Sequence, residues 1–354
     1  METIRQSGAQ PAQARLQPQP THRPKVYVTR VIPEATLELL RASCDVSVWP
    51  GELPPPYETL KREARDAEGI LCLLTDRIDA ALLDACPRLR VVSNLAVGYD
   101  NIDVAAATTR GILVGNTPGM LDETTADFAF ALLLAAARRI VEGVDNVRTG
   151  GWRTWGPLTL LGADIHHATL GVIGLGRIGA RVAQRARGFE MRVLYATPMR
   201  RPAHQELEAR LGLTYASLDD LFAQADFVSI HAPLNEQTRG LFNRQRLRQM
   251  KRSAILINTA RGPIVETDAL VAALQADEIA GAALDVTDPE PLPEAHPLLA
   301  APNCIVTPHI ASATYATRGQ MADLAARNLL AGLAGQPLPA AVNYEAIASL
   351  RSQG

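Results

Sequence analysis

The fold of this chain is decided by the stretch ATLGVIGLGRIG, which occupies residues 168–179. Its apolar first half is typical of a buried strand, and the residues that follow it are typical of a helix. Gly174 allows a tight turn, Gly176 lets the backbone approach a pyrophosphate, and Gly179 lets the helix pack against the sheet. Arg177 and Ile178 lie at the helix start, where free amides favour phosphate groups. The stretch therefore predicts a dinucleotide site that includes these five residues.

The next predicted strand, residues 191–195, ends where chains specific for the unphosphorylated cofactor place an acidic residue. No acid stands there. Thr197, Arg200 and Arg201 follow instead, and a hydroxyl with two guanidinium groups suits a 2′-phosphate that no carboxylate repels. We therefore predict that NADP(H) is preferred, with NAD(H) as the second choice. The alternative is that both arginines belong to a solvated loop.

Length and composition indicate a globular protein with two domains, since the chain has 354 residues of which 47% are apolar. A net charge of −2 argues against nucleic acid as a partner, and the longest apolar run is too short to span a membrane. The four cysteines lack metal-site spacing, so we predict no metal, no disulfides and a cytoplasmic location. Residues 1–23 are expected to be a disordered tail, with an organelle-targeting segment as the alternative.

From residue 24 onward, short apolar segments alternate with helical ones. This alternation predicts an α/β protein with doubly wound parallel sheets. One long helix is predicted from about residue 122 to 147, where it would join the two domains. A loop with Trp152 and Trp155 follows it. Three interpretations of this loop remain open, namely a subunit interface, an active-site wall and ordinary packing.

The predicted strands after the glycine turn end in polar groups, and such ends converge on one crevice of a doubly wound sheet. Arg261 offers a planar fork that can grip a carboxylate. His309 suits proton delivery, and a hydrogen bond to the Glu290 carboxylate would favour its protonated form. Asp285 either accepts a hydrogen bond from the nicotinamide carboxamide or caps a helix. The structural alternatives are a surface arginine, a packed histidine and a solvated loop acid.

These residues predict the reduction of a small 2-oxo acid. Arg261 and the backbone amides of Ala96, Val97 and Gly98 would hold the carboxylate of the substrate. The carbonyl carbon would accept hydride from a dihydronicotinamide, and His309 would protonate the carbonyl oxygen.

In this order, the motifs resemble the D-isomer-specific 2-hydroxyacid dehydrogenase family. The resemblance runs from about residue 24 to 343 and is carried by GLGRIG at 174–179, HAPL at 231–234, NTARG at 258–262, DVTDPEPL at 285–292 and PHIASA at 308–313. It implies a Rossmann coenzyme domain, residues 122–309, inserted into a flavodoxin-like substrate domain, residues 24–121 and 310–345. It also implies that Arg261, Glu290 and His309 are catalytic and that the protein is a homodimer. Further cofactor contacts implied by the resemblance are Thr125, His231, Pro233, Thr238 and Thr259.

Within this family, the loop at 97–103, the tryptophan loop and residues 285–293 most resemble glyoxylate and hydroxypyruvate reductases. Val97 disfavours phosphite, because phosphite dehydrogenases of the family carry lysine there, and Glu290 disfavours formate, because formate dehydrogenases carry glutamine. The sequence therefore predicts an NADPH-preferring reductase that forms glycolate and D-glycerate. The alternatives are an enzyme for bulkier 2-oxo acids and a dinucleotide-sensing scaffold or corepressor. The complete arginine, glutamate and histidine set favours an enzyme.

Overall fold

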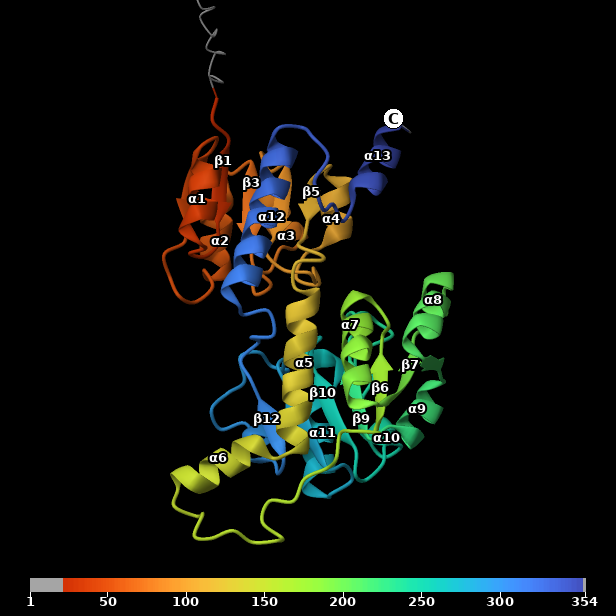
Figure 1. Ribbon diagram of the computed structural model, residues 1–354. Helices are drawn as coiled ribbons and strands as arrows, with labels where there is room; N and C mark the ends of the chain where they lie inside the picture. Colours follow the sequence, from red (N-terminus) through yellow and green to blue (C-terminus); the bar gives the residue numbers. More distant parts are fainter. Residues whose placement is uncertain (1–21, 353–354) are drawn as a thin grey trace, which may run out of the picture.

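The computed structural model describes residues 22–352, which form two parallel β-sheets covered by helices on both faces (Figure 1). One sheet has five strands and the other has seven. The predicted α/β class with two doubly wound domains is therefore confirmed. The tail predicted over residues 1–23 lies outside the described residues except for His22 and Arg23.

The five-stranded sheet has the order β2-β1-β3-β4-β5, which is the flavodoxin-like order. Helices α1 and α12 pack together over one face of this sheet, and α2, α3 and α4 lie on the other (Figure 1). The strands are β1 (Lys25–Val28), β2 (Asp45–Val48), β3 (Gly69–Cys72), β4 (Val91–Asn94) and β5 (Leu113–Gly115). The helices are α1 (Glu34–Arg41), α2 (Tyr57–Ala64), α3 (Ala80–Ala85), α4 (Val104–Thr109), α12 (Tyr315–Leu333) and α13 (Tyr344–Ser352). Helix α13 contacts α4 and β5. The residues packed on this sheet therefore extend past residue 345, where the domain was predicted to end.

The seven-stranded sheet has the order β12-β11-β10-β9-β6-β7-β8, and its strand order reverses between β6 and β9 as in a Rossmann sheet. Its strands are β6 (Thr169–Ile173), β7 (Arg192–Ala196), β8 (Leu213–Tyr215), β9 (Phe227–Ile230), β10 (Ile255–Asn258), β11 (Gly281–Leu284) and β12 (Cys304–Val306). Its helices are α5 (Asp122–Ala137), α6 (Ile140–Arg148), α7 (Arg177–Ala186), α8 (Pro202–Leu211), α9 (Leu218–Gln224), α10 (Arg244–Leu247) and α11 (Thr267–Gln275). Short 3₁₀ turns lie at Arg187–Phe189, Gly262–Ile264 and Pro297–Ala300.

The central strands of both sheets are apolar without alternation, because each sheet is covered on both faces. Every residue of β3, β9, β10 and β11 is buried. In the coenzyme domain, α5 and α7 pack against one face of the sheet, and residues of α9 and α11 belong to the core on the other (Figure 1).

The prediction of a single helix over residues 122–147 is wrong, because the helix is interrupted between α5 and α6. Arg139 adopts a left-handed backbone with φ of 50°, and α6 leaves α5 at a steep angle (Figure 1). The Ala137 carbonyl, which would continue the helix, instead accepts a hydrogen bond of 2.8 Å from the Ala163 amide. Tertiary contact with a later segment therefore ends α5.

Helices α5 and α12 begin where the chain passes between the two domains (Figure 1). A hydrogen bond of 2.6 Å joins Thr124 Oγ1 in the first turn of α5 to Thr317 Oγ1 in the first turn of α12. Within residues 22–352, none of the helices has the length and apolar character needed to cross a membrane.

Candidate active site

The glycine turn after β6 has the geometry that its sequence predicts. Gly174 has φ of 91°, and a Cβ on it would lie 2.9 Å from the His231 carbonyl oxygen. A Cβ on Gly179 would lie 2.1 Å from the Gly174 carbonyl oxygen, because α7 packs tightly against the turn. A Cβ on Gly176 would meet no described atom within 4 Å, so the space over this residue is open. Within residues 22–352, no side chain caps the N-terminus of α7.

These features fit a bound dinucleotide. The open space at Gly176 lies at a helix start whose first amides lack a side-chain cap, which is the arrangement that binds a pyrophosphate. At the end of β10, the Thr259 hydroxyl is buried and has no hydrogen-bond partner among the described residues. A buried hydroxyl without a partner is costly, and a ligand atom would satisfy it.

The other residues expected to contact the cofactor lie on α5 and on the loop after β9. Thr125 is buried in the first turn of α5. His231 follows β9, and burial lowers its pKa to about 4, so its ring is neutral at neutral pH. The Thr238 hydroxyl donates to the Pro233 carbonyl at 2.6 Å, which closes the loop after β9. Thr238 therefore shapes this loop through an internal bond.

The loop after β7 contains Thr197, Arg200 and Arg201 at the predicted 2′-phosphate position. The sequence prediction that this position has no carboxylate is wrong, because Glu208 of α8 reaches it. Arg200 donates from Nε and Nη2 to Glu208, with 2.8 Å between Nε and Oε1. The Tyr195 hydroxyl also donates to Glu208. Sequence reasoning missed Glu208 because it lies on the following helix.

His309 and Glu290 lie 19 residues apart in the chain and form a close pair. His309 Nδ1 lies 2.6 Å from Glu290 Oε1, and the two side chains are 23% and 33% exposed. Burial alone raises the pKa of Glu290, but the hydrogen bond and charge of His309 outweigh it, so this pKa lies below its ordinary value. The Thr287 amide and the charge of Arg261 act in the same direction. Glu290 is therefore ionised at neutral pH.

Asp285, at the end of β11, fixes the backbone that carries His309. Its carboxylate accepts hydrogen bonds from the amides of Ile310 and Ala311 at 2.8 and 2.7 Å and from the Thr307 hydroxyl at 2.7 Å. His309 itself has a left-handed φ of 53°, and its amide donates to the Asp285 carbonyl at 2.9 Å. These contacts hold a backbone conformation that a histidine rarely adopts. Asp285 caps none of the helices within residues 22–352, and its contact with the nicotinamide carboxamide stays a prediction.

Arg261 extends from the coenzyme domain to the substrate domain. Its Nε donates to Asp100 Oδ1 at 3.0 Å, and its Nη1 donates to the Ala260 carbonyl at 2.8 Å. Its Nη2 donates to no protein acceptor within residues 22–352, and it would lie 1.7 Å from a Cβ on Gly98. Asp100 was missed by sequence reasoning because 161 residues separate it from Arg261. The close approach requires glycine at position 98.

The predicted catalytic loops also contact one another. A Cβ on Gly262 would lie 1.9 Å from the Thr287 carbonyl oxygen, so the turn after Arg261 packs against the segment that leads to Glu290. The positive charge of Arg261 also contributes to the lowered pKa of the Glu290 carboxyl. Arg261, Glu290, His309 and the loop at 96–98 are therefore brought together at the carboxyl ends of the strands.

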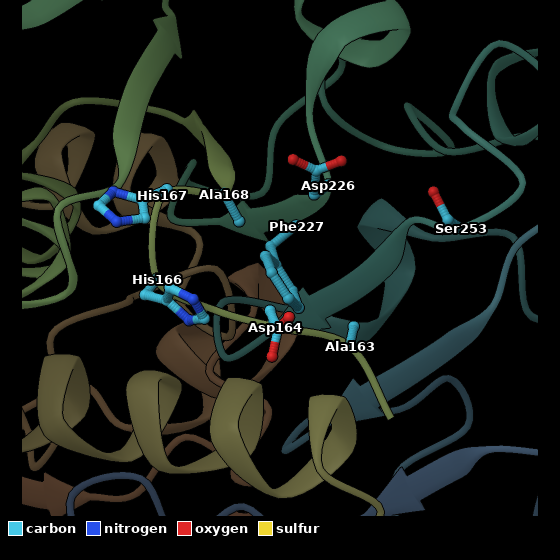
Figure 2. Close-up of a pocket in the computed structure, with 8 residues that line it drawn as sticks. All are labelled: Ala163, Asp164, His166, His167, Ala168, Asp226, Phe227 and Ser253. Atoms are coloured by element: carbon cyan, nitrogen blue, oxygen red, sulfur yellow. The ribbon is translucent and has the colours of Figure 1, made fainter. Parts of the chain in front are cut away.

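A pocket at the opposite edge of the coenzyme sheet is separate from this site. It lies at the amino ends of β6, β9 and β10, and Figure 2 shows Asp164, Asp226 and Phe227 among the side chains that line it. In doubly wound sheets, ligands bind beyond the carboxyl ends of the strands. This rule favours the carboxyl-end residues Arg261 and His309 as the site.

The tryptophan loop lies at the end of the coenzyme domain that faces away from the substrate domain (Figure 1). Trp152 is 65% exposed and Trp155 is 80% exposed. These positions argue against ordinary packing and against a wall of the active site in the same chain. The third interpretation, a subunit interface, stays a prediction.

Comparison with known proteins agrees with this geometry. Residues 130–311 match the model of the D-isomer specific 2-hydroxyacid dehydrogenase NAD-binding domain. The chain is similar to a glyoxylate reductase of Aeropyrum pernix, with 52% identity over 92% of this chain and 97% of that protein. The solved structure of the TT0316 protein from Thermus thermophilus is 48% identical and superposes with a TM-score of 0.84, covering 90% of this chain and 99% of that one.

A further solved structure is the NADPH-dependent glyoxylate/hydroxypyruvate reductase of Sinorhizobium meliloti in complex with NADP and malonate. It is 34% identical, with a TM-score of 0.81, and covers 91% of this chain and 97% of that one. The fold, the glycine turn and the relatives that share about half of the sequence all indicate the same family. The chain therefore belongs to the D-isomer-specific 2-hydroxyacid dehydrogenase family and is an NAD(P)-dependent oxidoreductase that acts on CH–OH groups.

Proposed function

We propose that this protein is an NADPH-preferring reductase of small 2-oxo acids, which converts glyoxylate to glycolate and hydroxypyruvate to D-glycerate. The observation that carries the proposal is the convergence of the His309–Glu290 pair with Arg261, whose Nη2 is directed at Gly98. A sensor or corepressor needs a dinucleotide pocket but has no need of this pair. The names of the relatives from Aeropyrum pernix and Sinorhizobium meliloti support the choice of substrate.

In the proposed mechanism, Arg261 and the amides of the loop at 96–98 hold the carboxylate of the 2-oxo acid. A bound dihydronicotinamide supplies the hydride that the carbonyl carbon accepts. Glu290 occupies Nδ1 of His309, which leaves Nε2 to donate a proton to the carbonyl oxygen. The contact with Glu290 also fixes the orientation of the imidazole ring.

The residues proposed to hold the dinucleotide are those around the glycine turn. Gly176 and the first amides of α7 would contact the pyrophosphate, and the buried Thr259 hydroxyl would gain a partner. Thr197, Arg200 and Arg201 would contact a 2′-phosphate. Glu208 neutralises part of the charge of Arg200, so we propose a preference for NADPH without exclusion of NADH. The four free cysteines, three of them buried, are consistent with a cytoplasmic location.

The substrate assignment predicts that the purified protein oxidises NADPH in the presence of glyoxylate and hydroxypyruvate, and that it uses NADH with lower kcat/KM. The absorbance of the reduced nicotinamide gives these rates directly, with pyruvate and phenylpyruvate as further substrates. Equal or better use of NADH would contradict the role of the arginine loop. A kcat/KM for phenylpyruvate above that for glyoxylate would instead support an enzyme for bulkier 2-oxo acids.

We also propose that the protein forms a homodimer through an apolar arm made of α6 and the loop that follows it. The arm extends from the coenzyme domain, away from the substrate domain (Figure 1). Exposed apolar side chains that gather on one segment are typical of an interaction surface. The exposed apolar side chains of the arm are Ile140, Val141, Val144, Val147, Trp152, Trp155, Leu158 and Leu161.

The Trp155→Ala variant is expected to raise the dissociation constant of the dimer by about 30-fold or more, because buried tryptophans are frequent hot spots of interfaces. Sedimentation equilibrium measures this constant. If Trp155 also reaches the cleft of the partner, the variant will raise KM for glyoxylate. Unchanged kinetics would exclude that contact. Leu53→Ala is the matched control, because Leu53 is 77% exposed but lies on the substrate domain.

A further inference from the structure

The carbonyl groups of the loop proposed to bind the substrate carboxylate are all anchored within the protein. The Ala96 carbonyl accepts from the Thr117 amide at 2.9 Å. The Val97 carbonyl accepts from Asn116 Nδ2 at 2.8 Å, and the Gly98 carbonyl accepts from Asn94 Nδ2 at 2.8 Å. Three successive carbonyl oxygens of the loop therefore have a protein donor.

Anchoring a carbonyl group also orients the amide that follows it, because each peptide unit is planar and trans. In such a unit the C=O of one residue and the N–H of the next point in opposite directions. The three anchors therefore turn the N–H groups of Val97, Gly98 and Tyr99 away from the body of the domain. In the part of the chain that the structure describes, these N–H groups donate to no protein acceptor.

Asn116 holds the peptide unit between Val97 and Gly98, next to Arg261. By holding the Val97 carbonyl, it orients the N–H of Gly98, the residue next to which Arg261 Nη2 lies. Asn116 is only 8% exposed, and Val97 is the single partner of its side chain among residues 22–352. Asn94 also donates to the side chain of Asn101 at 3.1 Å, so its removal would disturb that side chain as well as the Gly98 carbonyl.

We propose that Asn116 is a positioning residue, which aims the Gly98 N–H at the substrate carboxylate so that this amide and Arg261 Nη2 bind it together. This inference rests on the proposed function, because it assigns a further determinant to the same carboxylate site. Asn116 touches neither substrate nor cofactor in this proposal. It acts through one peptide unit, so its loss should weaken binding of the carboxylate and leave the proton-transfer pair intact.

The test compares Asn116→Ser with the wild type, since serine is too short to reach the Val97 carbonyl and carries no charge. Oxamate, a carboxylate analogue of the substrate, is titrated calorimetrically into the enzyme saturated with NADPH. We expect its dissociation constant and the KM for glyoxylate to rise about tenfold, the effect of one hydrogen bond to a charged group. The single-turnover rate at saturating glyoxylate and the NADPH dissociation constant should stay within about twofold of the wild type.

Asn343→Ser is the matched control, because Asn343 is also a buried asparagine of this domain and also anchors backbone, at Ile112 and Val114. It should lower Tm without changing oxamate affinity. The proposal is overturned if Asn116→Ser leaves oxamate binding unchanged, or if Asn343→Ser weakens it equally. Asn116→Leu provides a second neutral variant of similar size if the serine variant fails to fold. An enzyme that binds oxamate but reduces no glyoxylate would refute the proposed function while the comparison at Asn116 still holds.

Discussion

The His309→Ala variant is expected to lower the rate of hydride transfer to glyoxylate by about 10²–10⁴-fold, the usual contribution of a positioned general acid. Its affinity for NADPH should be unchanged, because the pyrophosphate turn at Gly174–Gly179 does not involve His309. The measurement is a single-turnover reaction at saturating substrate, since product release limits steady-state turnover in many enzymes. Fluorescence titration with NADPH gives the affinity.

The matched control is His166→Ala, because His166 is another histidine of the coenzyme domain but lies at the opposite edge of the sheet, in the pocket of Figure 2. This variant should react at the rate of the wild type. Full activity of His309→Ala would remove His309 as the proton donor. A loss of NADPH binding in the same variant would instead indicate a structural role.

The partner of His309 gives the same experiment a second readout. Glu290→Gln keeps the shape of the side chain and an acceptor oxygen near Nδ1 but removes the negative charge. The pKa of Glu290 is already lowered mainly through its contact with His309, so the charge interaction between the two groups is favourable. Without the charge that holds the His309 ring in place, the single-turnover rate with glyoxylate should fall by about tenfold or more, the effect of one hydrogen bond to a charged group. An unchanged single-turnover rate would contradict this coupling.

The sequence was sufficient to predict the fold because the relevant signals are local. The apolar run and spaced glycines at residues 168–179 specify a strand, a turn and a helix through contacts within one βα unit. The alternation of short apolar and helical segments specifies parallel sheets for the same reason. The break at Arg139 was not predictable in this way, because it depends on Ala163, a residue far along the chain that binds the Ala137 carbonyl.

The candidate site divides along the same line. Arg261 and His309 were proposed because each follows a predicted strand, and the contact of His309 with Glu290 was predicted with them, but the partners of the two arginine sites were found only in the structure. Asp100 lies 161 residues from Arg261, and Glu208 lies one helix beyond the arginine loop that it neutralises. A signal for Asn94 and Asn116 was available. Both are polar residues at or just after the ends of strands, Asn94 in β4 and Asn116 after β5, and the rule applied to the coenzyme domain would have singled them out in the substrate domain.

Replacement of Arg261 is expected to have the other large effect, and it falls on carboxylate recognition. Two edges of the guanidinium group are fixed by Asp100 and the Ala260 carbonyl, which leaves Nη2 directed at Gly98. Arg261→Ala should therefore lower kcat/KM for glyoxylate by about 10²-fold, since it removes a charge-assisted hydrogen bond worth up to about 3 kcal/mol and the approach geometry that this bond sets. Steady-state kinetics with NADPH measures the loss.

Arg261→Lys separates charge from geometry. A lysine ammonium keeps the positive charge, but it cannot hold both anchors and still direct a third donor at the substrate, so activity should recover only in small part. Methylglyoxal, a 2-oxo aldehyde without a carboxylate, is the control substrate. Because it offers nothing for Arg261 to grip, kcat/KM for methylglyoxal should fall far less in both variants than kcat/KM for glyoxylate. Equal losses on the two substrates would show that Arg261 acts on the reacting carbonyl or on the fold, and the proposed grip on the carboxylate would then have to be abandoned.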